Sequence, residues 1–448
     1  MVGEELSRAL RGVVGAEVSG LTRLSGGASR ETWAFDARRA DGSSERLILR
    51  RDPPGAARVS AGGMGLEARA IATAGRHGVP VPPILASSDD AGAVGAPFIV
   101  MGRIDGETIP RRILRDDAYA AARERLAADC GTVLARLHAI DPGEVGGLDE
   151  QDQVGQYRDA LDALGQPHPA FELGLRWLED NRPVPGPAAV VHGDFRNGNL
   201  IVGPDGLRAV LDWELVHAGD PLEDLGWLCV RAWRFGVDRP VGGFGDYDQL
   251  LGAYAAERGV DVDRQALRWW EVLGTLKWGV MCIMQATTHT SGLVRSVELA
   301  AIGRRVCENE WDLLELLPQP WGGRGASPPA AGQGWSGAPH DMPDAPGLVE
   351  AVREFLQGDV MGATSGRVQF HARVASNVLG IVERELRLGP AHAARHAAGL
   401  VGLGYADEAA VAAAIRDGSA DDHLADVAAF CRATVRDKLD VANPRYVG

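Results

Sequence analysis

The sequence contains few cysteines, and their spacing does not suit a metal or redox site. Five cysteines are scattered over 448 residues, and none belongs to a Cys-x-x-Cys pair. An odd, scattered set argues against a disulfide framework and predicts reduced, mostly buried thiols. The length is sufficient for two or three domains.

Positive charge and long apolar runs are also scarce. Lys and Arg number 46 against 61 Asp and Glu, so the formal net charge is −15. A non-specific nucleic-acid binder needs a basic surface, so we expect no nucleic-acid partner. The most apolar stretch, 269–286, contains Glu271 and Lys277, which favours a buried helix over a membrane span. The first residues are acidic and lack the apolar core of a signal peptide, so we expect a cytoplasmic protein with no membrane partner.

The strongest functional signal lies in residues 190–213. An apolar run leads into His192-Gly193-Asp194, Asn199 follows five positions after Asp194, and a second apolar run ends at Asp212. This order predicts a strand, a polar loop and a hairpin. Two carboxylates and an amide at nearby strand ends are what phosphoryl transfer to a hydroxyl needs, with one Asp accepting the proton and Asn and the second Asp holding Mg²⁺. The alternative is a hairpin whose Asp and Asn side chains bond only their own backbone.

These residues resemble the aminoglycoside phosphotransferase-like kinases. The resemblance rests on the His192-to-Asn199 motif, on Leu211-Asp212-Trp213-Glu214, and on the Gly-Asp-Pro-Leu-Glu-Asp-Leu run at 219–225. It implies an α+β, bilobal protein-kinase-like fold with a β-rich N-lobe and a helical C-lobe. It also implies Asp194 as catalytic base, Asn199 and Asp212 as ligands of Mg²⁺, and ATP or GTP as co-substrate. His192 is expected to shape the loop, and Asp220 and Asp224 to brace it.

The N-terminal part is predicted to bind the nucleotide. A Gly/Ser loop between two strand-like runs would let backbone N–H groups approach the phosphates; its residues are Ser25, Gly26, Gly27 and Ser29. Arg50 ends the next strand, where protein kinases carry a phosphate-binding Lys, and Glu67 on a helix predicted at 64–77 would pair with it. The family places the adenine against the backbone from about Met101 to Arg103. The competing interpretations are a plain hairpin turn, a surface Arg and a solvated Glu.

The predicted domains are an N-lobe at 1–104, a C-lobe with the catalytic loop at 105–317, a Gly/Pro-rich linker at 318–346 and a small all-α domain at 347–448. The last segment looks like an uncharacterised bacterial helical domain that accompanies this kinase subfamily, and it could regulate, dimerise or cover the acceptor site. His392 and His396 are spaced i, i+4, but the zincin Glu is missing, so we expect no metal there. The further predicted helices span 119–138, 153–181, 222–235, 247–258, 263–290, 295–316, 347–357, 364–387, 390–401, 406–416 and 419–439.

The sequence therefore predicts a Mg²⁺-dependent small-molecule kinase, a phosphotransferase with an alcohol group as acceptor. Residues 49–55 and 97–101 look closest to the branch found with acyl-CoA dehydrogenases, which implies a hydroxyacyl-CoA or a hydroxy acid as acceptor. One alternative is an aminoglycoside or macrolide phosphotransferase. The other is a non-catalytic pseudokinase scaffold. This alternative is favoured by Arg50 and the extra helical domain, and it is opposed by the intact Asp194, Asn199 and Asp212. A homodimer is a further hypothesis.

Overall fold

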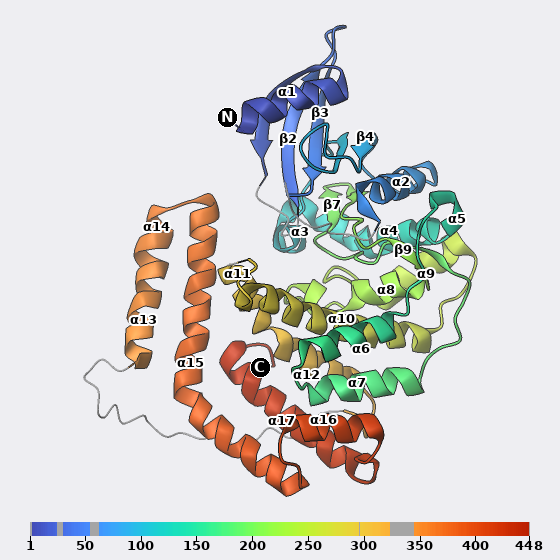
Figure 1. The fold of residues 1–448 in the computed structure, drawn as a ribbon. Helices are drawn as coiled ribbons and strands as arrows, with labels where there is room; N and C mark the ends of the chain where they lie inside the picture. The colour runs from blue at the N-terminus through green and yellow to red at the C-terminus, as the bar shows by residue number, and fades with distance from the viewer. Residues whose placement is uncertain (1, 25–29, 54–61, 295, 323–344, 448) are drawn as a thin grey trace. The chain divides into compact units, whose positions relative to one another are not determined.

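The computed structural model describes residues 2–24, 30–53, 62–294, 296–322 and 345–447 (Figure 1). The chain divides into two compact units. The first unit comprises Met1–Gln151 and Pro183–Glu271, and the second comprises Asp152–Arg182 and Val272–Gly448. The boundary after Glu271 falls inside one continuous helix, α10 (Arg264–Thr290).

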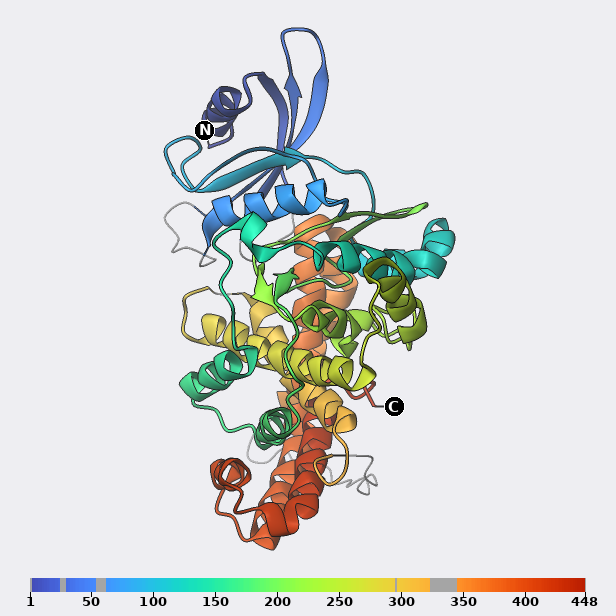
Figure 2. The ribbon, with the colours of Figure 1, turned by 90° about the vertical axis from the view of Figure 1, so that its right-hand side faces the viewer.

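The first unit begins with an antiparallel sheet, drawn in blue in Figure 2. Its five strands follow the order β1-β2-β3-β5-β4. Successive side chains of a strand point to opposite faces of the sheet, so alternate residues of β3 pack into two different hydrophobic cores. Leu47 and Leu49 pack in one core with Leu10 of the first helix, whereas Ile48 packs in another with Met64 of the second. The elements are α1 (Val2–Val14), β1 (Glu17–Arg23), β2 (Glu31–Arg38), β3 (Ser44–Arg51), α2 (Gly63–Arg76), β4 (Ile84–Ser88) and β5 (Phe98–Gly102).

The rest of the first unit surrounds a hairpin and is mostly helical. Hairpin β7–β8 has the predicted Gly/Pro turn, and the strand before it, β6, pairs with β9. Buried residues of α4 and α9, among them Leu134 and Leu250, share one core with Phe195 and Trp213 of the hairpin region. The elements are α3 (Pro110–Arg115), α4 (Ala120–Leu137), α5 (Pro142–Val145), β6 (Ala189–Val191), β7 (Leu200–Gly203), β8 (Gly206–Val210), β9 (His217–Gly219), α8 (Leu222–Cys229), a 3-10 turn (Arg231–Arg234) and α9 (Tyr247–Arg258).

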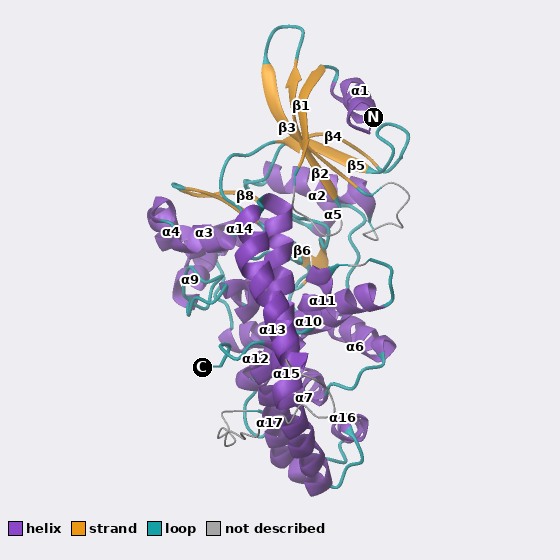
Figure 3. Ribbon diagram, turned by 90° about the vertical axis from the view of Figure 1, so that its left-hand side faces the viewer, coloured by secondary structure: helices purple, strands orange, loops and turns teal. Residues whose placement is uncertain are grey.

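The described part of the second unit is helical (Figure 3). Helix α17 packs along α12 and α15, and α16 packs on α7. Thus the C-terminal helices share a compact unit with helices from two earlier segments, and the domain bounds predicted from the sequence stay a prediction. Besides the second part of α10, the elements are α6 (Gln153–Leu164), α7 (Pro169–Asp180), α11 (Val297–Gly303), α12 (Val306–Leu316), α13 (Ala345–Phe355), a π-helical turn (Leu356–Val360), α14 (Met361–Ala363), α15 (Gly366–Leu403), α16 (Glu408–Asp417) and α17 (Leu424–Ala442).

The sequence-based prediction of two helices, at 364–387 and 390–401, is wrong. Helix α15 continues from Gly366 to Leu403 with Pro390 inside it. An interior proline removes one backbone hydrogen bond and kinks a helix, and Figure 1 shows that α15 bends along its length. Packing along α17 holds both parts in one helix. Otherwise the structure confirms the predicted α+β architecture, with strands in the first half of the chain and an all-α C-terminal region.

Candidate active site

Three side chains hold the carboxylate of Asp194. Trp227 Nε1 and Arg196 Nε donate to Oδ1 at 2.8 and 2.9 Å, and Asn199 Nδ2 donates to Oδ2 at 2.6 Å. A carboxylate offers about four lone-pair sites, so a further donor, such as a hydroxyl, can still bind. The bonds fix the orientation of the carboxylate and leave it able to accept a proton.

His192 and Asp224 fix the loop that carries Asp194. His192 Nδ1 accepts the Asp194 N–H at 3.1 Å and Nε2 lies 3.0 Å from the Leu211 carbonyl oxygen, so a neutral ring with its proton on Nε2 satisfies both contacts. Burial lowers the pKa of His192, which favours this neutral form. Asp224 accepts the backbone N–H groups of His192 and Gly193 at 2.8 and 2.9 Å. Both residues shape and brace the loop, as the sequence predicts.

Gly193 is required by the backbone of this loop. Its φ is +79°, and a Cβ there would lie 2.5 Å from the Leu215 carbonyl oxygen. A larger residue would therefore be strained and would also clash.

Arg50 links two carboxylates close to the loop that carries Asp194. Its Nη1 donates to Glu67 Oε1 at 2.8 Å and its Nη2 donates to Asp212 Oδ1 at 2.6 Å. Glu67 is buried and also binds Arg30. Burial raises the pKa of Asp212, but the positive charge of Arg50 outweighs this, and the net shift is downward. Burial and the neighbouring Asp212 raise the pKa of Glu214.

The donor set beside Asp194 suits a hard divalent cation. Asn199 uses Nδ2 for Asp194, and no described residue donates to its Oδ1. The Leu211 N–H donates to the Asn199 carbonyl oxygen at 2.8 Å. Because Leu211 directly precedes Asp212, this bond brings Asn199 close to Asp212 in space. Asp212 has a left-handed backbone with φ +67°, which is uncommon outside glycine and is typical of functional positions. Amide and carboxylate oxygens are ligands of Mg²⁺, so the residues present fit that ion.

Comparison with protein families gives a match over residues 20–270 to the model described as "Phosphotransferase enzyme family", which is more than half of the chain. The chain belongs to this phosphotransferase family. A second model, "Domain of unknown function (DUF6285)", matches residues 362–446.

Known proteins and structures agree with the family and the fold. Acyl-CoA dehydrogenase family member 10 of Mus musculus is 30% identical over 263 residues, which is 55% of this chain and 24% of that protein. Family member 11 of Rattus norvegicus is 30% identical over 243 residues, which is 49% of this chain and 30% of that protein. The chain thus spans less than a third of these relatives. A crystal structure from Ralstonia eutropha JMP134, provisionally assigned as an aminoglycoside phosphotransferase, matches this chain with a TM-score of 0.55 and 20% identity. The match covers 70% of this chain and 97% of that one. It confirms the bilobal, protein-kinase-like fold.

The structure places the other predicted residues of this phosphotransferase as follows. Met101 is buried at the end of β5, and Arg103 is exposed after it. The N–H groups of Gly102 and Arg103 already donate to the Pro83 and Arg46 carbonyl oxygens, both at 2.9 Å, so an adenine contact from those two residues would use their carbonyl groups. The predicted phosphate-loop residues lie outside the described residues; they are Ser25, Gly26, Gly27 and Ser29.

Three side chains of the phosphotransferase site were not predicted from the sequence. Arg30, buried, binds Glu67 and lies 3.2 Å from Asp52. Arg196 contacts Asp194 directly, and its position between Asp194 and Asn199 in the motif is a signal that could have identified it. Trp227 lies 33 positions after Asp194, and only the fold brings it there.

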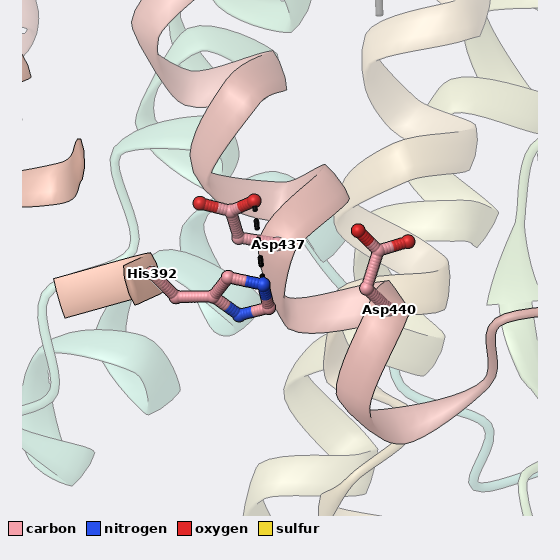
Figure 4. Close-up of side chains that lie close together, drawn as sticks. All are labelled: His392, Asp437 and Asp440. Atoms are coloured by element: carbon pink, nitrogen blue, oxygen red, sulfur yellow. Dashed lines mark ion pairs between the residues drawn. The ribbon is translucent and has the colours of Figure 1, made fainter. Parts of the chain in front are cut away.

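A possible metal cluster in the second unit is already neutralised by arginine. His392, Asp437 and Asp440 have ligand atoms within 4.8 Å of one another (Figure 4). However, Arg395 Nη2 lies 2.6 Å from Asp437 Oδ1, and Arg436 Nε lies 3.3 Å from Asp440 Oδ1. Arg395 Nε also donates to Asp437 Oδ2 at 3.2 Å, so both oxygens of Asp437 are engaged and we assign no metal to this cluster.

Proposed function

We propose that this chain is a Mg²⁺-dependent small-molecule kinase that transfers the γ-phosphate of ATP, or of GTP, to a hydroxyl group. One observation supports it most: Asn199 binds the Asp194 carboxylate while Arg50 joins Glu67 to Asp212. A base, two metal ligands and a paired phosphate-binding cation are the protein groups that phosphoryl transfer uses. Family membership supports the same reaction class.

The chain's own residues would act as follows. Asp194 would orient the acceptor hydroxyl and take its proton, since its carboxylate is fixed and keeps acceptor capacity. Asn199 and Asp212 would hold Mg²⁺, which when bound neutralises charge on the nucleotide phosphates. A guanidinium has five N–H donors, so Arg50 keeps donors for phosphate after binding Glu67 and Asp212.

The acceptor that we propose is a hydroxyacyl-CoA or a related hydroxy acid. The matched relatives are named as acyl-CoA dehydrogenase family members, which supports an acyl substrate. Arg103, which follows β5, and Arg111 and Arg115 of α3 are exposed in the first unit and supply positive charge for a polyanion. An aminoglycoside or macrolide acceptor is the second candidate, and the fold likeness to a provisionally assigned aminoglycoside phosphotransferase favours it only at the level of fold.

We also propose a cytoplasmic protein with no nucleic-acid or membrane partner, and the net charge of −15 argues against the nucleic-acid partner. One described helical stretch, Gly366–Asp417, is long and apolar enough to cross a membrane by length and composition alone. Core helices of soluble proteins pass the same test, but only 22% of this window is buried. A homodimer stays a hypothesis.

The proposed function is tested by phosphoryl transfer from Mg²⁺-ATP and Mg²⁺-GTP to hydroxyacyl-CoAs, hydroxy acids, aminoglycosides and macrolides. We expect transfer to one acyl acceptor class. Failure to bind either Mg²⁺-nucleotide would overturn the kinase proposal and favour the pseudokinase. Transfer to antibiotics alone would replace the acyl acceptor by the second candidate.

A further inference from the structure

Arg196 presents an unused guanidinium fork beside the proposed base. Its Nε donates to Asp194 Oδ1, but neither Nη1 nor Nη2 has a hydrogen-bond partner among the described residues. The side chain is 24% exposed, so the fork is partly desolvated and yet reachable. A planar pair of unpaired N–H groups matches the two oxygens of a carboxylate or phosphoryl group.

Aromatic packing holds this fork, and a neighbouring glycine makes room for it. The Arg196 guanidinium lies over the ring of Trp233, with 4.4 Å from Cζ to the ring centroid. Trp233 is itself buried and packs on Trp227, whose indole also holds Asp194. Gly198 leaves room for the fork, because a Cβ there would lie 2.7 Å from Arg196 Nη1. An arginine held this way loses little further side-chain entropy when it binds an anion.

The fork is distinct from the cation assigned to the nucleotide. Arg50 lies on β3 and is engaged by Glu67 and Asp212. Arg196 belongs to the catalytic loop itself and rests on the 3-10 turn after α8. Asp194 balances the charge of Arg196, so this arginine would favour an anionic acceptor through its free N–H donors and not through a net positive charge.

We infer that Arg196 selects the acceptor by binding a carboxylate that lies close to the reacting hydroxyl. This rests on the proposed function and narrows its acceptor to a hydroxy acid with a free carboxylate. The same fork would also suit oxygens of the transferred phosphoryl group, so the test must separate these two sources of anionic oxygen.

The test compares 2-, 3- and 4-hydroxybutyrate with their uncharged amides as acceptors. The proteins are the wild type, Arg196→Met, Arg196→Lys and, as a matched control, Arg208→Met. Arg208 is a partly exposed arginine of the β7–β8 hairpin that pairs with Asp205. Unfolding midpoints verify that each variant is folded, and Mg²⁺-ATP affinity is measured on the same samples.

We expect wild type to prefer one acid over its amide by on the order of 10- to 100-fold in kcat/KM, the value of a charge-assisted hydrogen bond. Arg196→Met should erase this preference, mainly through KM, and leave Mg²⁺-ATP affinity unchanged. Arg208→Met should keep it, and Arg196→Lys should retain part of it because lysine keeps the charge and loses the fork.

Three results would overturn the inference. These are a wild type without a preference for the acid, a preference that survives Arg196→Met, and an equal loss for acid and amide, which would mean that Arg196 acts on the phosphoryl group or on Asp194 and not on the acceptor carboxylate. If wild type transfers phosphate to neither acceptor, calorimetric binding of the hydroxybutyrates decides. Binding that needs Arg196 but not Arg208 would support the inference although the kinase proposal had failed, and binding independent of Arg196 would overturn it.

Discussion

Arg50 Nη2 donates a hydrogen bond to Asp212 Oδ1 across 2.6 Å, although 162 positions separate the two residues in the chain. The other terminal nitrogen, Nη1, binds Glu67. One guanidinium thus joins strand β3, helix α2 and the end of the catalytic hairpin. A lysine ammonium is a compact point charge and does not offer this planar two-sided geometry.

Replacing Arg50 by lysine should therefore weaken the site, even though protein kinases use lysine at this position. We expect Arg50→Lys to lose one of the two contacts and to bind Mg²⁺-ATP on the order of 10-fold more weakly. A nucleotide titration measures this. Tighter binding by Arg50→Lys would show that the arginine is a defect and would favour the pseudokinase.

Asp212→Asn separates the charge of Asp212 from its backbone conformation. Asparagine tolerates the left-handed φ of +67° about as well as aspartate does, so the fold should persist. The loss of a charged ligand should reduce Mg²⁺-nucleotide affinity by at least the roughly 10- to 100-fold typical of altered metal-site residues. Asp205→Asn, in the exposed turn of the same hairpin, is the control and should bind normally. Equal affinities for Asp212→Asn and the control would remove Asp212 from the metal site.

The stability of the second unit should depend on pH through Glu310. This carboxylate is 1% exposed, accepts from Lys438 and pairs with His168 Nδ1 at 2.9 Å. Burial alone would raise its pKa, but Lys438 and His168 outweigh burial and lower it to about 2 from 4.5. The carboxylate therefore contributes about 3 kcal/mol above pH 4.5, and this contribution is lost as the pH falls towards 2.

Chemical unfolding at a series of pH values checks this dependence. Wild type should lose unfolding free energy between pH 4.5 and 2, and Glu310→Gln should lose less over the same range while being less stable near neutral pH. Glu385→Gln, an exposed partner of Arg304, should follow wild type. A Glu310→Gln profile parallel to that of wild type would contradict the assigned pairing.

Arg432 should be a main support of the C-terminal helices. Its side chain is 8% exposed, pairs with Glu315, donates to the Leu314 carbonyl oxygen at 3.0 Å and lies over the Trp311 ring at 5.0 Å. Arg432→Met removes the partner of the Glu315 carboxylate and of the Leu314 carbonyl group in α12, so we expect a loss of roughly 3 kcal/mol in unfolding free energy. Arg436→Met, at a more exposed i, i+4 pair, should cost less than about 1 kcal/mol. Equal effects in thermal unfolding would show that α17 is a loosely attached appendage.

Local sequence patterns predicted the helices and strands. Contacts that join residues far apart in the sequence were harder to predict. Helix α9 has the predicted bounds because a capping box at Asp246 starts it and Gly259 ends it. The pairing of Arg50 with Glu67 is confirmed, while the catalytic roles stay predictions. The fork of Arg196 could not be predicted, since it depends on Trp233 from a separate turn.

Composition explains the arginine at position 50. Lys277 and Lys438 are the only lysines in the chain, although Lys and Arg together number 46. The substitution of arginine for the usual kinase lysine is thus in keeping with the whole sequence. Arg50 is therefore weak evidence for a degraded kinase site.

The most direct test measures phosphate transfer and nucleotide affinity together for wild type and Asp194→Asn. Asparagine keeps the size of the side chain but cannot accept the hydroxyl proton, so we predict transfer reduced by at least roughly 100-fold. Mg²⁺-ATP affinity should stay close to that of wild type, because Asn199, Asp212 and Arg50 are unchanged. Full transfer activity in Asp194→Asn would contradict the account, since the residue that three side chains hold in place would then not be the base.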